Sequence, residues 1–306
     1  MPHIASFLFL AALLAGPASA QQPTRPYNLA GGAERDLLPP GTHWQLLGEG
    51  YHLTGDSAVD SHGNVYFTDV DRNRILKIGL DGNITTWRQG TNGAHGVAFG
   101  PDGRLYAGQH DLKRIVAFST GGAETVIAEG VQSHHLAVTS RNRVYVNVPP
   151  AHSVWLIDSD RSKHVVHDRL NWPRGVRASA DESRLVVNDP PTRLVWSFRI
   201  EPDGSLSNGR PFYRLETPTN ADNPDPGGMA FDTEDFLYVA TTLGVQVFDP
   251  AGRAVAILKA PGGAASNVLF GGRNLEWLYV TDGSRMYRRP TKRRGAGPWK
   301  PAPVPR

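Results

Sequence analysis

An internal repeat of about forty residues runs through this sequence and limits the folds that the chain can adopt. In each unit a short apolar strand is followed by a turn with Asp or Gly and then by a strand of the form x-L-Y-V, as in HGVAFGPDGRLYAGQH (95–110). Spacings of 40, 39, 40, 53 and 39 residues separate the positions that open the first strand of each unit, which are Gly55, His95, His134, Arg174, Gly227 and Ser266. A period of this length is typical of a repeat architecture.

Two further strands follow in most units, such as RILKIGL (74–80) and ITTWRQ (84–89), which are joined by the hairpin signal Asp81-Gly82. Four antiparallel strands per forty residues form a β-propeller blade. The six units therefore predict an all-β, six-bladed β-propeller. The last unit lacks a fourth strand, and WQLLGEGYHL (44–53) is expected to supply it and to close the ring without an open sheet edge.

The two ends of the chain differ from the repeats. Residues 1–20 contain an apolar stretch and end in Ala-Ser-Ala before Gln21, which is typical of a cleaved signal peptide. Its twelve apolar residues are too few to span a bilayer, so we expect a periplasmic or secreted protein without stable membrane insertion after cleavage. We expect a linker at 21–42, the propeller at 43–290 and a basic Pro/Gly-rich tail at 291–306.

Composition excludes several function classes. The 306 residues include no Cys, which excludes disulfides, thiolate zinc sites and cysteine nucleophiles. The net charge is +3, but eight Lys or Arg follow Asp282, so everything before them carries 3 − 8 = −5. Because basic and aromatic residues do not alternate along a blade, we expect no nucleic-acid partner. No P-loop and no G-x-S-x-G nucleophile elbow is present.

Residues that open the innermost strands of a propeller converge on its central channel, so we expect His95, His134 and Arg174 to form the catalytic group. Histidine can exchange a proton near neutral pH, and the guanidinium fork of arginine matches a carboxylate. This combination suits an anionic sugar. The side chains expected to bind substrate at the same rim are Arg174, His135, His110, Asn188 and Asn267.

A transition-metal site is a second interpretation of the same histidines. Imidazole ligands suit zinc, copper, iron or nickel, and His95, His134 and Asp56 together would make an open three-ligand site. The adjacent Arg174 argues against it, because a fixed positive charge repels a cation.

Several phrases resemble the SMP-30/gluconolactonase/LRE-like family of six-bladed propellers. Among them are SNVLFGGRNLEWLYVTDG (266–283) and NWPRGVRASADESRLVVND (171–189), and the similarity extends from about residue 46 to residue 287. The resemblance implies a lactone-hydrolysing enzyme with one divalent cation, often calcium, at the pore. There a Glu, an Asn and an Asp from different blades would hold the cation, which polarises the lactone carbonyl.

The residue-by-residue match departs from that ligand set. The family's Glu falls on Gly55, its Asn on Arg174 and its Asp on Gly227, while a further polar Asn falls on His134. Two nearby carboxylates could stand in if local bulges turn them toward the pore. The predicted metal ligands are therefore Asp56, His95, His134 and Asp225.

The leading functional hypothesis is hydrolysis of a sugar lactone or related small carbohydrate acid, which is carboxylic ester hydrolase chemistry. One alternative is a uronate-type polysaccharide or oligosaccharide lyase that uses the same residues. The other is a non-catalytic propeller that binds a ligand or a protein. Fold class does not decide among them, and the sequence leaves open whether the insertion at 208–226 covers the pore.

Overall fold

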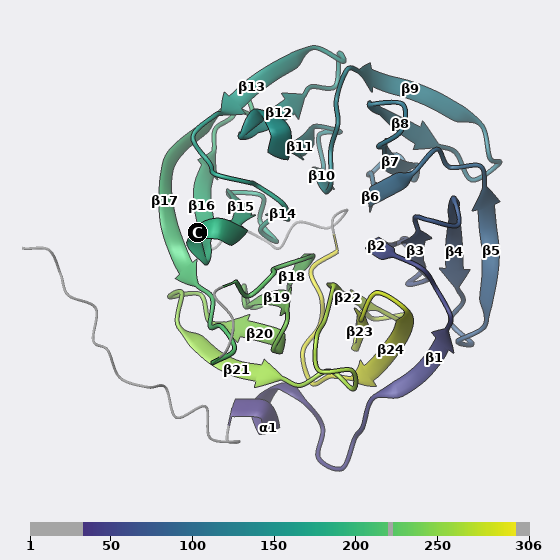
Figure 1. Ribbon diagram of the computed structural model, residues 1–306, viewed down its shortest axis with the longest axis vertical. Coiled ribbons are helices and arrows are strands. Elements are labelled where there is room, and N and C mark those ends of the chain that lie inside the picture. Colours follow the sequence, from purple (N-terminus) through teal and green to yellow (C-terminus); the bar gives the residue numbers. More distant parts are fainter. Residues whose placement is uncertain (1–32, 220–222, 298–306) are drawn as a thin grey trace, which may run out of the picture.

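The computed structural model describes residues 33–219 and 223–297. Within these residues, six four-stranded antiparallel sheets are arranged in a ring around a central channel (Figure 1). The predicted six-bladed β-propeller is therefore confirmed. No helix in the described part of the chain is long and apolar enough to cross a membrane.

Each blade runs from the channel outward, with consecutive strands paired as hairpins. The innermost strands are β2 (Thr54–Val59), β6 (Ala94–Phe99), β10 (Leu136–Val138), β14 (Val176–Ala178), β18 (Met229–Phe231) and β22 (Asn267–Gly271). The second strands are β3 (Val65–Asp69), β7 (Leu105–Gln109), β11 (Val144–Val148), β15 (Arg184–Asp189), β19 (Leu237–Thr241) and β23 (Trp277–Thr281).

The third strands are β4 (Arg74–Ile78), β8 (Arg114–Phe118), β12 (Ser153–Ile157), β16 (Leu194–Ile200), β20 (Gly244–Phe248) and β24 (Arg285–Pro290). The outermost strands are β5 (Ile84–Gln89), β9 (Glu124–Glu129), β13 (Lys163–His167), β17 (Leu206–Arg214), β21 (Ala254–Leu258) and β1 (Gln45–Glu49). The helix α1 (Ala33–Leu37) precedes them.

The ring is closed by strands from both ends of the propeller, as the sequence predicts. β1 pairs antiparallel with β24, placing Gln45 opposite Arg288 and Glu49 opposite Arg285. The last blade thereby gains its outermost strand, and its first and last strands belong to opposite ends of the fold (Figure 1). Closure of this kind leaves no unpaired edge between the first and last blades.

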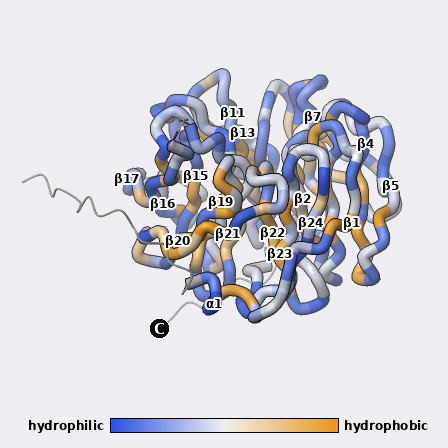
Figure 2. The backbone as a smooth tube through the Cα atoms, turned by 60° about the horizontal axis from the view of Figure 1, so that its bottom comes forward, coloured by the Kyte–Doolittle hydropathy of each residue, from blue (hydrophilic) through white to orange (hydrophobic). Residues whose placement is uncertain are grey.

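The core lies between neighbouring blades. Inner and middle strands are covered on both faces and are therefore apolar along most of their length, whereas the connecting turns are hydrophilic (Figure 2). Four tryptophans each pack against an apolar cluster, and the indole of Trp87 meets the ring of Tyr66 edge-on at 5.4 Å. The four are Trp87, Trp155, Trp196 and Trp277.

The packed region extends beyond the predicted boundaries at both ends. Leu37 and Leu38 are 2% exposed and join the cluster between the last two blades, so the expected linker at 21–42 includes packed residues. The Thr291 hydroxyl donates to the Leu37 carbonyl, and Arg293 forms ion pairs with acidic residues of the neighbouring blade. The expected tail therefore begins inside the fold. The predicted signal peptide lies outside the described residues.

Candidate functional site

Two imidazoles meet at one mouth of the channel. His95 lies in β6, and His134 lies just before β10, so adjacent blades supply them. Their ring centroids are 4.8 Å apart and the ring planes are inclined by 66°. Both side chains are half-buried. The sequence-based expectation that these two residues lie together is confirmed.

The hydrogen bond of His95 defines its tautomer. Its Nδ1 lies 3.1 Å from the backbone carbonyl oxygen of His134, and a carbonyl can only accept, so Nδ1 carries the proton. In the neutral ring Nε2 therefore holds the lone pair. Burial, reinforced by the neighbouring His135 and His134, lowers the pKa of His95 to about 3. His95 is thus neutral at pH 7.

His134 is also neutral, but it is less buried. Burial lowers its pKa to about 4, and the neighbouring His135, Arg174 and His110 act in the same direction. Within the described residues, its buried Nδ1 has no hydrogen-bond partner. His110 lies beside it, with ring centroids 5.9 Å apart, and the His110 Nε2 is 2.9 Å from the Gln132 amide nitrogen.

An ion pair stands next to the histidines on the rim. The Arg174 guanidinium donates to the Asp225 carboxylate. Asp225 has a φ of 42° and lies in the segment before β18 that contains the end of the insertion. Side-chain exposures of 33% for Arg174 and 57% for Asp225 leave the pair open to solvent. A substrate anion could therefore compete with Asp225 for the guanidinium.

Asp56, directly below the rim, has its carboxylate enclosed by the protein. One oxygen accepts from the Ser57 backbone N–H at 2.8 Å and from the Asn267 amide at 2.6 Å. The other accepts from the Val97 backbone N–H at 3.1 Å and lies 3.2 Å from the His135 Nδ1. Although burial alone would raise the pKa of Asp56, the partner His135 and these hydrogen bonds lower it.

Three of the residues expected to bind substrate are buried and engaged with the protein. His135 and Asn267 hold Asp56, as described above, and both are less than 5% exposed. Asn188 is fully buried, accepts from the Gly175 N–H and donates to the Gly227 carbonyl, and so ties two blades together. In the structure these three side chains join neighbouring strands, and their direct contact with substrate stays a prediction.

The side chains present do not fit the divalent cation that the resemblance implies. Both oxygens of Asp56 are occupied by protein donors, and Asp225 pairs with a cationic guanidinium. Across residues 33–219 and 223–297 no three His, Asp or Glu side chains are grouped to hold a metal ion, so the predicted set of Asp56, His95, His134 and Asp225 is not assembled.

The backbone also opposes a carboxylate at the vacant family positions. A Cβ atom built on Gly227 would lie 1.9 Å from the Ser266 carbonyl oxygen, and one on Gly55 would lie 2.9 Å from a Val70 methyl carbon. Contacts under 3.0 Å require something to shift, and at Gly227 the obstacle is backbone. The close packing of the inner strands therefore leaves no room for a side chain at these two positions.

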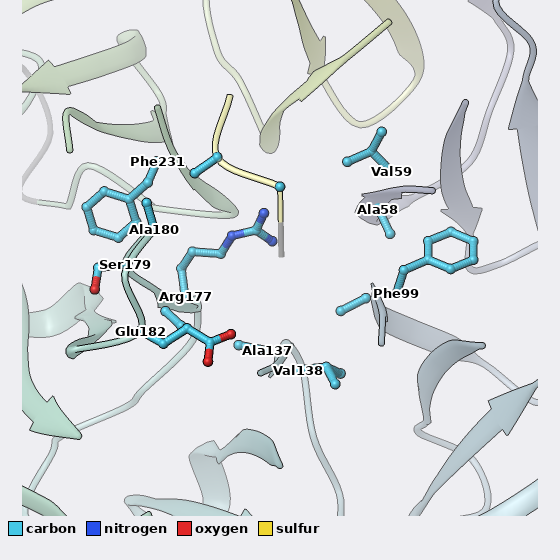
Figure 3. A pocket seen from close by; sticks show the side chains of 14 residues that line it. Ala58, Val59, Phe99, Ala137, Val138, Arg177, Ser179, Ala180, Glu182 and Phe231 are labelled. Atoms are coloured by element: carbon cyan, nitrogen blue, oxygen red, sulfur yellow. The ribbon is translucent and has the colours of Figure 1, made fainter. Parts of the chain in front are cut away.

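Sequence reasoning missed Arg177. It lies in β14, three residues after Arg174, and its guanidinium extends into the channel (Figure 3). The aligned repeats contain a signal for Arg177, because the residues at the corresponding position of the other five blades are all uncharged. They are Ala58, Ala98, Ala137, Ala230 and Leu269.

Known proteins share both the sequence pattern and the fold. Residues 54–284 match the family described as SMP-30/Gluconolactonase/LRE-like region. A pentonolactonase of Haloferax volcanii is 21% identical over 225 residues, which are 71% of this chain and 76% of that protein.

Two solved structures have the same architecture. A gluconolactonase of Xanthomonas campestris superposes with a TM-score of 0.75 at 22% identity, covering 85% of this chain and 93% of that chain. A calcium-binding regucalcin of Agrobacterium tumefaciens does so with a TM-score of 0.70 at 14% identity, covering 86% and 98%. At these identities the structures show a common fold, and the match over residues 54–284 shows that the chain belongs to the SMP-30/gluconolactonase/LRE-like family.

Proposed function

We propose that the protein hydrolyses a small sugar-derived lactone at the mouth of the channel formed by His95, His134 and Arg174. The observation that carries this proposal is the meeting of two neutral imidazoles and a solvent-accessible guanidinium at that mouth. Membership of a family with gluconolactonase and pentonolactonase relatives supports lactones as the substrate class.

Arg174 is the group that binds the lactone carbonyl. Attack on a lactone places negative charge on the carbonyl oxygen, and a preorganised cation stabilises that charge in the transition state. The guanidinium has donors to spare, because a single Asp225 contact uses only part of its five N–H groups. Asp225 holds the fork in place until the substrate displaces or shares it.

His134 is the general base. It is the less buried of the paired imidazoles, it is neutral at pH 7, and it lies close enough to Arg174 for that charge to lower its pKa. The imidazole takes a proton from water as the oxygen attacks the carbonyl carbon. The ring C–O bond then breaks, and the same proton passes to the departing alkoxide to give the open hydroxy acid.

His95 is a positioning residue in this scheme. Its Nδ1–H bond to the His134 carbonyl oxygen fixes the backbone that carries the base. The low pKa of His95, about 3, suits this role, because a second positive charge beside Arg174 would oppose protonation of His134 during the reaction.

We also propose that this chain replaces the carboxylate-held cation of its relatives with the arginine–histidine pair. The support is the glycines at two family ligand positions, the arginine at the third, and the saturated Asp56 carboxylate. A guanidinium at a former ligand position supplies the positive charge that the cation would bring.

The experiment is a pH-indicator assay over a panel of pentono- and hexonolactones, with and without EDTA. We expect turnover that persists in EDTA. Arg174→Met and His134→Gln should each lower kcat/KM by about 10²- to 10³-fold. Arg169→Met and His43→Gln are matched controls, because Arg169 is 88% exposed and His43 is exposed.

The pH profile separates the base from an ordinary histidine. Because His134 must be neutral, kcat/KM should fall as the pH drops through about 4 rather than through the usual 6.5. Activity that EDTA abolishes and calcium restores would overturn the arginine-based scheme. Saturable binding without turnover, or an ultraviolet-absorbing unsaturated product from a uronate, would overturn hydrolysis in favour of a binding module or a lyase.

A further inference from the structure

A second charged feature lies deeper in the channel, away from the rim. Arg177 occupies a layer to which the other five blades contribute alanine or leucine, so one long cationic side chain extends among short apolar ones. Figure 3 shows its guanidinium at the centre of a pocket, with Ala58, Ala137 and Val138 around it. The single arginine therefore determines the charge of this layer.

The guanidinium of Arg177 lacks an anionic partner. Throughout the part of the chain that the structure describes, it forms neither a hydrogen bond nor an ion pair. Burial lowers the pKa of Arg177, and the negative Asp56 above it only partly opposes this effect. Asp56 cannot act as a direct acceptor without losing a partner, since both of its oxygens are occupied.

The other acid on the pocket wall is also engaged. The two carboxylate oxygens of Glu182 accept from the backbone N–H and the hydroxyl of Ser140, each at 2.6 Å. Much of the remaining lining is apolar, including Phe99 and Phe231. Arg177 is half-buried, so water can still reach it, but a guanidinium that faces mostly apolar walls without an anion carries a desolvation cost.

The size of the pocket limits what can neutralise this charge. Its volume is about 30 Å³, and Ala296 and Gly297 from the C-terminal segment form part of its wall. This is room for one or two water-sized groups. A sugar acid does not fit into this pocket. The pocket and the proposed lactone site therefore accept ligands of different size.

We propose that Arg177 binds a small monovalent anion, a halide or a carboxylate of formate size, inside the channel. The anion completes the guanidinium's hydrogen bonds and neutralises the layer below Asp56. The inference does not depend on lactone hydrolysis, because it rests on a different side chain, a different cavity and a different ligand size.

The first test is a thermal unfolding series on the full chain at constant ionic strength, in which sodium bromide, chloride or formate replaces the sodium salt of the bulky sulfonate MES. MES is too large for the pocket and is not a sugar acid, so it is not a ligand of the proposed lactone site. We expect a saturable rise of about 2–4 °C in the Tm of the wild type. Arg177→Met should abolish the rise, whereas Arg169→Met, the same change at an exposed arginine, should leave it intact.

The second test locates the anion directly. Bromide soaked into crystals of the wild type should give an anomalous peak within hydrogen-bonding distance of the Arg177 guanidinium, and formate should compete it away. If small anions raise the Tm of Arg177→Met as much as that of the wild type, the proposal is overturned. Bromide found only on the outer surface, or water alone at Arg177 in saturating bromide, would also overturn it.

Discussion

Removal of the Asp56 carboxylate should destabilise the whole ring, because this one group joins several blades. Asp56 belongs to the first blade. Its oxygens are contacted by Val97 of the second blade, His135 of the third and Asn267 of the sixth. In Asp56→Ala the donors on all three neighbouring blades lose their acceptor in a buried position.

The expected loss in the free energy of unfolding is about 3–5 kcal/mol, the range measured when one partner of a buried ion pair is removed. Water that enters from the channel should limit this loss, because water molecules can accept hydrogen bonds from some of the donors that Asp56 leaves unpaired. For a domain of this size the loss corresponds to a fall of roughly 6–20 °C in Tm. The exposed pair partner Asp225 is the control, and Asp225→Ala should cost less than about 1 kcal/mol.

The assay is urea unfolding of wild type, Asp56→Ala and Asp225→Ala, followed by tryptophan fluorescence at several pH values. The pKa of Asp56 is lowered in the folded protein, so its contribution is present above the unfolded value of 3.8 and is lost as the pH falls through the folded value. The gap between wild type and Asp56→Ala should therefore narrow below pH 3.8. Equal stability of the two alanine variants at pH 7 would show that the Asp56 carboxylate does not hold the blades together.

Two further predictions concern stability. The pKa values of His95 and His134 are lowered from 6.5, so the unfolded chain binds more protons than the folded chain below that pH. The free energy of unfolding should therefore fall on acidification, by about 2 kcal/mol for His95 alone between pH 6.5 and about pH 5. In urea titrations of a His95→Gln/His134→Gln double variant, the free energy of unfolding should depend less steeply on pH, and a slope equal to that of the wild type would contradict the lowered pKa values. Gly227→Ala should lower the free energy of unfolding by about 1–3 kcal/mol, because the added Cβ would meet the Ser266 carbonyl oxygen. Gly121→Ala is the control and should not lower it, because the nearest neighbour of its Cβ would be 3.9 Å away. Equal Tm values for these two variants would exclude the backbone obstacle at Gly227.

Local pattern was sufficient to predict how the strands are arranged. The forty-residue period, the hairpin turns and the missing last strand predicted six blades and closure by the segment that contains β1, and all of this is confirmed. The same alignment placed His95 and His134 at one rim, where their rings now meet. These features depend on strand order and residue spacing, which any chain with this periodicity must satisfy.

Side-chain partners were decided by the tertiary structure. Asn188 and Asn267 were expected to face substrate, but each has its hydrogen bonds within the protein. The alignment contained Arg177, yet only the closed channel shows that its guanidinium points into a small apolar pocket.

The propeller, its closure and the identity of the residues at the channel mouth follow from the sequence, because alternating burial and a fixed repeat length are local properties of the chain. Which polar groups remain free depends on the folded arrangement of the blades. Asp56 and Asn267 are 211 residues apart in sequence and 2.6 Å apart between hydrogen-bonding atoms. A hydrogen bond depends on distances of a few tenths of an ångström, and that precision arises only when the inner strands of different blades pack around one axis.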